Sequence, residues 1–117
     1  MKIKNNVSYE YYHDTYNSGY DGVVPPEFFP MYAAKARYEV SAMLTSDKTE
    51  AYTETVSLCM CEIADKLYTE DRKMGVKSES TDGYTVTYTD GGNLSRDIKK
   101  IIIRWLGNSG LLYSGVG

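Results

Sequence analysis

The chain has 117 residues, a net charge of −3, and a composition that is 42% apolar and 25% charged. This length supports a single domain over residues 1–117 with one modest core, and the proportions are those of a globular protein rather than a disordered segment. The negative net charge argues against a protein held on nucleic acid by bulk electrostatics, and no apolar run approaches the ~20 residues of a membrane span.

Tyrosine dominates the aromatic content, with twelve tyrosines against two phenylalanines and one tryptophan. A tyrosine combines a large apolar ring with a hydroxyl that needs a partner, and it suits half-buried surfaces and interfaces. The enrichment indicates either a small core completed by rings at its rim or a surface that binds another protein.

The first predicted element is a short helix capped by Ser8, which places Tyr9, Tyr12 and Tyr16 on one face. The cluster Asn17-Ser-Gly-Tyr-Asp-Gly22 predicts a turn. Pro25-Pro-Glu27 then predicts the start of a longer helix, although Pro30 allows a later start. Spacings of three and four give this helix a buried stripe, which comprises Phe29, Tyr32, Ala33, Ala36, Val40, Met43 and Leu44.

A second long helix is predicted from Thr49 or Glu50 towards Tyr68. Its apolar stripe comprises Tyr52, Val56, Cys59, Met60, Ile63 and Leu67. The polar run from Thr69 to Gly75 is a plausible end of this helix.

The next segment predicts a β-hairpin arm over about 76–88. The runs 76–80 and 84–88 alternate with period two on either side of Thr81-Asp82-Gly83. Tyr84, Val86 and Tyr88 then share one face of the second strand. A two-stranded ribbon is marginally stable alone, so this arm would need the helices or another chain for support.

A third long helix is predicted after a cap at Asn93 or Ser95. Its core face comprises Ile98, Ile101, Ile102, Trp105 and Leu106. Gly107-Asn108 predicts a left-handed stop, followed by an extended tail over about 107–117. The apolar run Leu111-Leu-Tyr113 in this tail suits either docking to a partner or packing on its own domain. The expected fold is therefore mainly α: one short and three longer helices, the hairpin between the last two, and the tail.

Residues that would indicate catalysis, a metal or a cofactor are sparse. His13 is the single histidine and has no nucleophile or second base beside it in the sequence. Gly91-Gly92-Asn93 lacks the Lys-Ser/Thr of a phosphate-binding loop. Cys59 and Cys61 are two residues apart on a helix and cannot bridge, which predicts buried reduced thiols in a cytosolic protein. We therefore expect no enzyme and no cofactor.

The basic residues of the last helix suggest an alternative function. Arg96, Lys99, Lys100 and Arg104 could meet phosphates, as in a small helical DNA-binding regulator. Four basic groups on the outside of an acidic protein are more often a solvated helix face.

Three patches in this order resemble the head–tail connector (adaptor) proteins of long-tailed bacteriophages. The first is Tyr11-Tyr-His-Asp-Thr-Tyr16 with Gly22-Val-Val-Pro-Pro-Glu-Phe28, an aromatic short helix, a turn and a proline-glutamate helix start. The second is Val76-Lys-Ser-Glu-Ser80 with Gly83-Tyr-Thr-Val-Thr-Tyr88. The third is the helix from Ile98 to Ile103 with the tail Leu106-Gly-Asn-Ser-Gly-Leu-Leu-Tyr-Ser-Gly-Val116.

The resemblance implies a structural virion protein of the neck, present in the host cytoplasm before assembly and not associated with membrane. Such adaptors form a ring of about twelve copies on the portal vertex. The ring extends the channel through which genomic DNA passes without sequence recognition, and it contacts the portal protein and the next neck or tail protein. By this resemblance, Leu111, Leu112, Tyr113 and Val116 are candidates for portal docking. Lys77, Glu79, Tyr84, Val86 and Tyr88 are candidates for contacts around the ring or along the channel.

Overall fold

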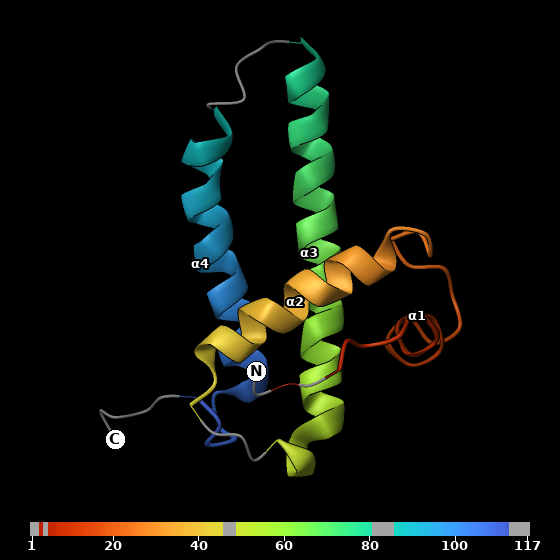
Figure 1. The fold of residues 1–117 in the computed structure, drawn as a ribbon, viewed down its shortest axis with the longest axis vertical. Helices are drawn as coiled ribbons and strands as arrows, with labels where there is room; N and C mark the ends of the chain where they lie inside the picture. Colours follow the sequence, from red (N-terminus) through yellow and green to blue (C-terminus); the bar gives the residue numbers. More distant parts are fainter. Residues whose placement is uncertain (1–2, 4, 46–48, 81–85, 113–117) are drawn as a thin grey trace.

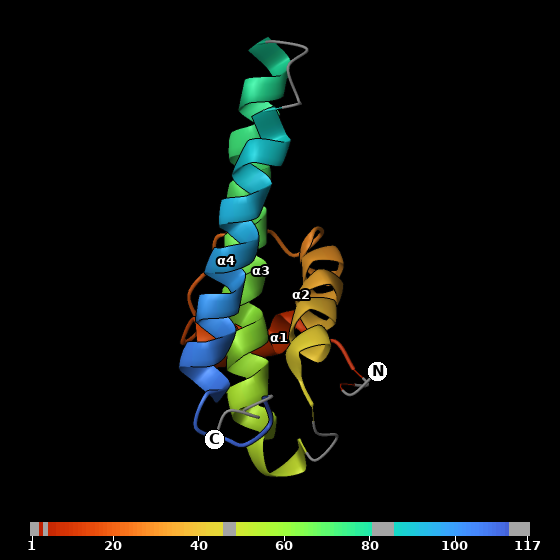
Figure 2. The same cartoon turned by 90° about the vertical axis from the view of Figure 1, so that its left-hand side faces the viewer.

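The computed structural model describes residues 3, 5–45, 49–80 and 86–112; for Ala51, 74–80 and 86–93 it describes the backbone alone (Figure 1). The described part is mainly helical and contains no strand. Two long helices, α3 (Thr53–Ser80) and α4 (Val86–Leu106), lie side by side, and α2 (Phe29–Met43) crosses α3 in a second layer (Figure 2). The molecule measures 46 × 37 × 21 Å, and its thin dimension corresponds to two helix layers of roughly 10 Å each.

The N-terminal helical segment follows the predicted pattern. The side chain of Ser8 accepts a hydrogen bond of 3.1 Å from the backbone N–H of Tyr11 and caps α1 (Tyr9–Tyr11), which continues as the π-helical turn η1 (Tyr12–Tyr16). Tyr12 is fully buried, and Tyr9 and Tyr16 pack against it with ring centroids 5.8 Å away. The two helical elements α1 and η1 lie on the side of α3 that faces away from α4, and η1 contacts α3 (Figure 1).

The loop after η1 turns where predicted. Of the two predicted starts for α2, the later one near Pro30 is closer to the observed start than the one at Pro25. Ser18 and Gly19 have φ of 57° and 88°, the left-handed conformation of a tight turn. Pro25 closes a turn with Phe29, and α2 begins at Phe29 with Pro30 in its first turn. The predicted stripe of α2 is confirmed: six of its seven residues are buried, and Met43 is half-buried.

The second long helix is longer than predicted, because α3 follows a 3-10 turn, η2 (Glu50–Tyr52), and continues to Ser80 rather than ending near Tyr68. Ion pairs between residues one helical turn apart stabilise the polar run from Thr69 to Gly75, where the end of the helix is predicted. The carboxylate of Glu70 lies 3.3 Å from the Nζ atoms of both Lys66 and Lys73. One glycine in a helix costs only about 1 kcal/mol relative to alanine, so Gly75 does not end it. Val56, Cys59, Met60 and Ile63 of the predicted stripe are buried, whereas Tyr52 is exposed.

The predicted β-hairpin over 76–88 is wrong in the described part of that segment. Residues 76–80 are the last turns of α3 and residues 86–88 the first turn of α4; 81–85 lie outside the described residues. The predicted cap at Asn93 or Ser95 therefore lies inside α4. Each helix of the pair satisfies its backbone hydrogen bonds internally, whereas an isolated two-stranded ribbon is only marginally stable. The strand propensity of these residues is therefore overridden by the helices that they continue.

The core lies between α2, α3 and the second half of α4. The predicted core face of α4 is confirmed, with Ile98, Ile101, Ile102 and Leu106 buried and Trp105 half-buried. The helix ends at Leu106 as expected, but the left-handed residue is Gly110, with φ of 83°, rather than Gly107. Among the described residues, no helix is long and apolar enough to span a bilayer.

Candidate functional site

The predicted docking tail is partly built into the fold. Leu111 is 3% exposed and belongs to the core, and Leu112 is half-buried against it. The carbonyl of Leu111 accepts hydrogen bonds from the backbone N–H of Thr45 at 2.8 Å and from its hydroxyl at 3.2 Å. Leu44 and Leu112 form an isolated antiparallel bridge. Leu111 is therefore an anchor inside its own chain and is not accessible for docking; Tyr113 and Val116 lie outside the described residues.

The predicted arm residues lie along the far ends of the two long helices. Lys77 and Glu79 fall in the last turns of α3, and Val86 and Tyr88 fall in the first turn of α4. Tyr84 falls outside the described residues. The structure brings the four positions on α3 and α4 to one end of the helix pair, beyond the point where α2 crosses α3 (Figures 1 and 2).

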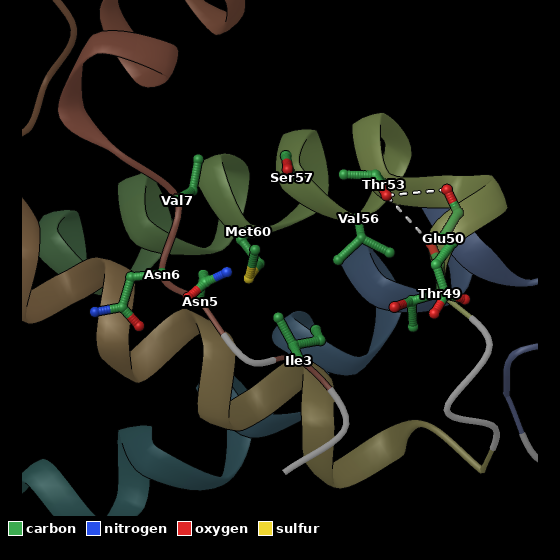
Figure 3. Close-up of a pocket in the computed structure, with 10 residues that line it drawn as sticks. All are labelled: Ile3, Asn5, Asn6, Val7, Thr49, Glu50, Thr53, Val56, Ser57 and Met60. Atoms are coloured by element: carbon green, nitrogen blue, oxygen red, sulfur yellow. Dashed lines mark hydrogen bonds between the residues drawn. The ribbon is translucent and has the colours of Figure 1, made fainter.

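A cavity of about 300 Å³ lies between the N-terminal segment and the start of α3 (Figure 3). Its apolar wall is formed by Ile3, Val7, Val56 and Met60, and its polar rim by Asn5, Asn6, Thr49, Glu50, Thr53 and Ser57. The hydroxyl of Thr53 donates to the carbonyl of Glu50 at 3.0 Å and fixes the first turn of α3. The size is at the small end for ligand pockets, and it would accept one apolar side chain or a similar small group.

The chemistry of this cavity is limited by its lining. Glu50 is the one titratable side chain among the ten lining residues. General acid–base catalysis needs a group held at a proton-transfer distance with a matched pKa, and none of the other nine described lining residues is an acid or a base. The lining favours binding over reaction.

A polar cluster joins α3 to α4 at the lower end of the pair. Glu62 of α3 accepts a hydrogen bond of 2.8 Å from the indole N–H of Trp105 and pairs with the guanidinium of Arg104. Burial would raise the pKa of Glu62, but the hydrogen bonds from Arg104 and Trp105 outweigh it and lower that pKa. Farther along the pair, Lys66 lies 3.4 Å from Asp97 of α4. These contacts fix the register of the two helices.

A second polar cluster joins η1 to α3 through Tyr12. Its hydroxyl donates to the carboxylate of Asp65 and accepts a hydrogen bond of 3.1 Å from the backbone N–H of Val24. Burial raises the pKa of Tyr12 and also that of Asp65, for which it outweighs the hydrogen bond from Tyr12. A Cβ on Gly22 would overlap the Tyr12 hydroxyl, so the chain needs glycine there. The cluster locks the loop onto α3.

The single histidine sits in an exposed acidic setting. The imidazole of His13 lies 2.7 Å from the carboxylate of Asp14 and 3.5 Å from that of Asp21, and the hydrogen bond that His13 donates to Asp14 raises the pKa of His13. The two cysteines are free and buried, as predicted, and burial raises the pKa of each thiol to about 12. In the part of the chain that the structure describes, no three His, Cys, Asp or Glu residues are placed to hold a metal ion.

Two exposed surfaces carry opposite charge, and of these only the cations on the outside of the last helix were identified from the sequence. The acidic surface lies on η1 and the following loop and comprises Asp14, Tyr20, Asp21, Val23, Glu27 and Phe28. The basic face lies on the outside of α4 and comprises Arg96, Lys99, Lys100 and Ile103. The acidic surface could have been predicted from the sequence, because no lysine or arginine occurs between Lys4 and Lys35. The exposure of its apolar side chains had no signal, since the same residue types also form the core.

Comparison with known proteins identifies no relative: no family model, no curated protein and no solved structure matches the chain. Similarity therefore supports no family assignment.

Proposed function

We propose that the chain is a structural head–tail adaptor of a tailed bacteriophage. In this role, copies form a ring of about twelve on the portal vertex, extend the DNA channel and join the filled head to the tail, without catalysis. The proposal is motivated by the three sequence patches, which occur in the order expected for such adaptors and span most of the chain.

The structural observation that carries the proposal is the length of the α3–α4 pair. The upper part of this pair extends beyond α2 and is not covered by the second layer of the body (Figures 1 and 2). A domain of this size gains little core from helices that project beyond their partners, because uncovered turns bury little apolar surface. A projecting helix pair suits contact with neighbouring subunits, the role expected of the β-hairpin. Lys77, Glu79, Tyr84, Val86 and Tyr88 remain the proposed ring or channel contacts.

The anchored C-terminal segment changes the proposed docking element. Leu111 holds the chain against the end of α2 and Leu112 is bridged to Leu44, so docking to the portal falls to the residues after Leu112, including Tyr113 and Val116. The net charge of −3 is consistent with a channel wall that does not retain DNA, since phosphates are held by clustered cations.

The test removes the proposed docking element without removing the anchor. In the parent phage, deletion of 113–117 keeps Leu111 and Leu112 and should yield heads that fill with DNA but carry no tails, as counted by electron microscopy of lysates. A matched control exchanges the exposed Thr69 for alanine, which should leave virions normal. Normal tailed virions from the deletion, with the protein present in them, would remove the docking assignment; absence of the protein from purified wild-type virions would remove the function itself.

A DNA-binding regulator is a second candidate, favoured by the exposure of Arg96, Lys99 and Lys100 on α4. It predicts DNA binding that weakens steeply with salt and is lost on Lys99→Ala/Lys100→Ala. No binding to duplex DNA at low ionic strength eliminates it.

A further inference from the structure

We propose that the basic face of α4 on one copy docks onto the acidic surface of a second copy. The inference rests on the proposed ring function and deepens it, because it names the two surfaces that meet.

The acidic surface has the composition of a protein interface. Tyr20, Val23 and Phe28 are 76%, 56% and 48% exposed, so three large apolar side chains face solvent on one loop. Asp14, Asp21 and Glu27 are exposed on the same turn and loop. Exposed large apolar side chains together with charged ones are the composition of a protein interface with a polar rim.

The basic face repeats this pattern with the opposite charge. The buried residues of α4 face α3, and the positions 96, 99, 100 and 103 fall on the opposite side of the helix at spacings of three and four. Ile103 is 54% exposed beside these cations. The exposed side chain of Ile103 does not contribute to the core of its own copy. In the proposed contact it meets the aromatic side chains of the acidic surface on the second copy.

The two surfaces lie on opposite sides of α3. The acidic surface follows η1 and the loop along one side, and α4 runs along the other (Figure 1). Surfaces that are complementary but different, and that face away from each other, cannot meet within one copy. They produce head-to-tail association, which closes into a ring when the rotation between copies permits.

A second copy fits the basic face better than nucleic acid does. Phosphate binding gains nothing from an exposed isoleucine among the cations, and the chain as a whole is negative. A partner with exposed aromatic rings and carboxylates would contact both the isoleucine and the cations of the basic face. The acidic surface supplies both the rings and the carboxylates.

The first experiment is charge reversal with complementation. Purified Lys99→Glu/Lys100→Glu and Asp21→Lys/Glu27→Lys variants should each self-associate at least about tenfold more weakly than the wild type in sedimentation at low ionic strength. An equimolar mixture of the two should recover association, because each altered surface then meets an altered partner. Glu50→Lys/Glu54→Lys changes the net charge by the same amount and in the same direction as Asp21→Lys/Glu27→Lys, but outside both surfaces, and it should associate as the wild type does. Circular dichroism checks that every variant is folded.

The second experiment locates the contact by cross-linking. Tyr20→Cys and Ile103→Cys each place one accessible thiol in a chain whose own cysteines are buried. A mixture of the two variants should form disulfide-linked dimers under mild oxidation, whereas Tyr20→Cys mixed with Tyr38→Cys, on the outer side of α2, should not.

The outcomes separate this inference from the proposed function. A wild-type protein that stays monomeric at about 1 mM and low ionic strength overturns the inference. So does association that is insensitive to both charge reversals, although a ring could then form through other surfaces and the adaptor function would stand. Loss of duplex DNA binding, rather than of self-association, in Lys99→Glu/Lys100→Glu would assign the basic face to nucleic acid and overturn it as well.

Discussion

Removing the Tyr12 hydroxyl, a single oxygen atom, should lower the free energy of unfolding by more than the loss of one exposed hydrogen bond would. Tyr12 is fully buried, and its hydroxyl serves two partners: the carboxylate of Asp65 on α3 and the backbone N–H of Val24 in the loop. In Tyr12→Phe the Val24 N–H loses its acceptor, which costs about 1–3 kcal/mol for a buried donor. The half-buried carboxylate of Asp65 also loses a donor. We expect a total loss of about 2–4 kcal/mol in the free energy of unfolding.

The measurement is urea unfolding at neutral pH, followed by the fluorescence of Trp105, the only tryptophan of the chain. Trp105 is half-buried and hydrogen-bonded to Glu62, so its emission should report loss of the α3–α4 contact. Tyr11→Phe is the matched control. The Tyr11 hydroxyl makes one exposed contact, 3.5 Å from the carbonyl of Glu54, and its loss should cost less than about 0.5 kcal/mol.

A double-mutant cycle isolates the pair. Tyr12→Phe and Asp65→Ala should be coupled by about 1–2 kcal/mol, because either substitution alone already breaks the same hydrogen bond. A coupling energy below about 0.5 kcal/mol would refute the reasoning, since the hydroxyl would then act through Val24 or through packing alone.

Four further outcomes follow from the same structure. Gly22→Ala should destabilise the protein by about 1–3 kcal/mol, because the new methyl group overlaps the Tyr12 hydroxyl; a neutral effect in urea unfolding would contradict the close approach. Leu111→Ala should cost about 2–4 kcal/mol in the same assay, whereas a surface residue would cost almost nothing. Because the folded-state pKa of Glu62 is lowered, its ionised form stabilises the fold above pH 4.5, and this contribution is lost as the pH falls through the folded pKa. Glu62→Gln should therefore flatten the loss of stability in acid, and an unchanged pH profile would argue against it. The two buried thiols should react with a thiol reagent at neutral pH only as the protein unfolds, so that their reaction rate and the tryptophan signal change at the same urea concentrations; fast reaction of the native protein would contradict their burial.

The helices and their buried stripes were predictable because they depend on short-range spacing. Apolar residues at intervals of three and four placed Phe29, Val40 and Ile102 in the core before any partner was known. The Ser8 cap was predictable for the same reason, since a cap and its helix are local.

The segment around the predicted hairpin was not predictable from local pattern. Val86 and Tyr88 alternate with threonines as in a strand, yet they begin a helix whose later turns pack on α3. Similarly, no local signal showed that Leu111 would fill the space at the end of α2, because that contact joins residues more than sixty positions apart. The cavity was equally hidden, since its walls come from two distant segments.

The bridge between Leu44 and Leu112 sets a geometric limit on what residues 113–117 can touch. A fully extended polypeptide advances at most ~3.3–3.6 Å per residue, so Gly117 can lie no farther than about 18 Å from Leu112. Any protein gripped by residues 113–117 must therefore approach to within that tether of the end of α2. A docking partner that sits instead against the far tips of α3 and α4 would have to be held by something other than this segment.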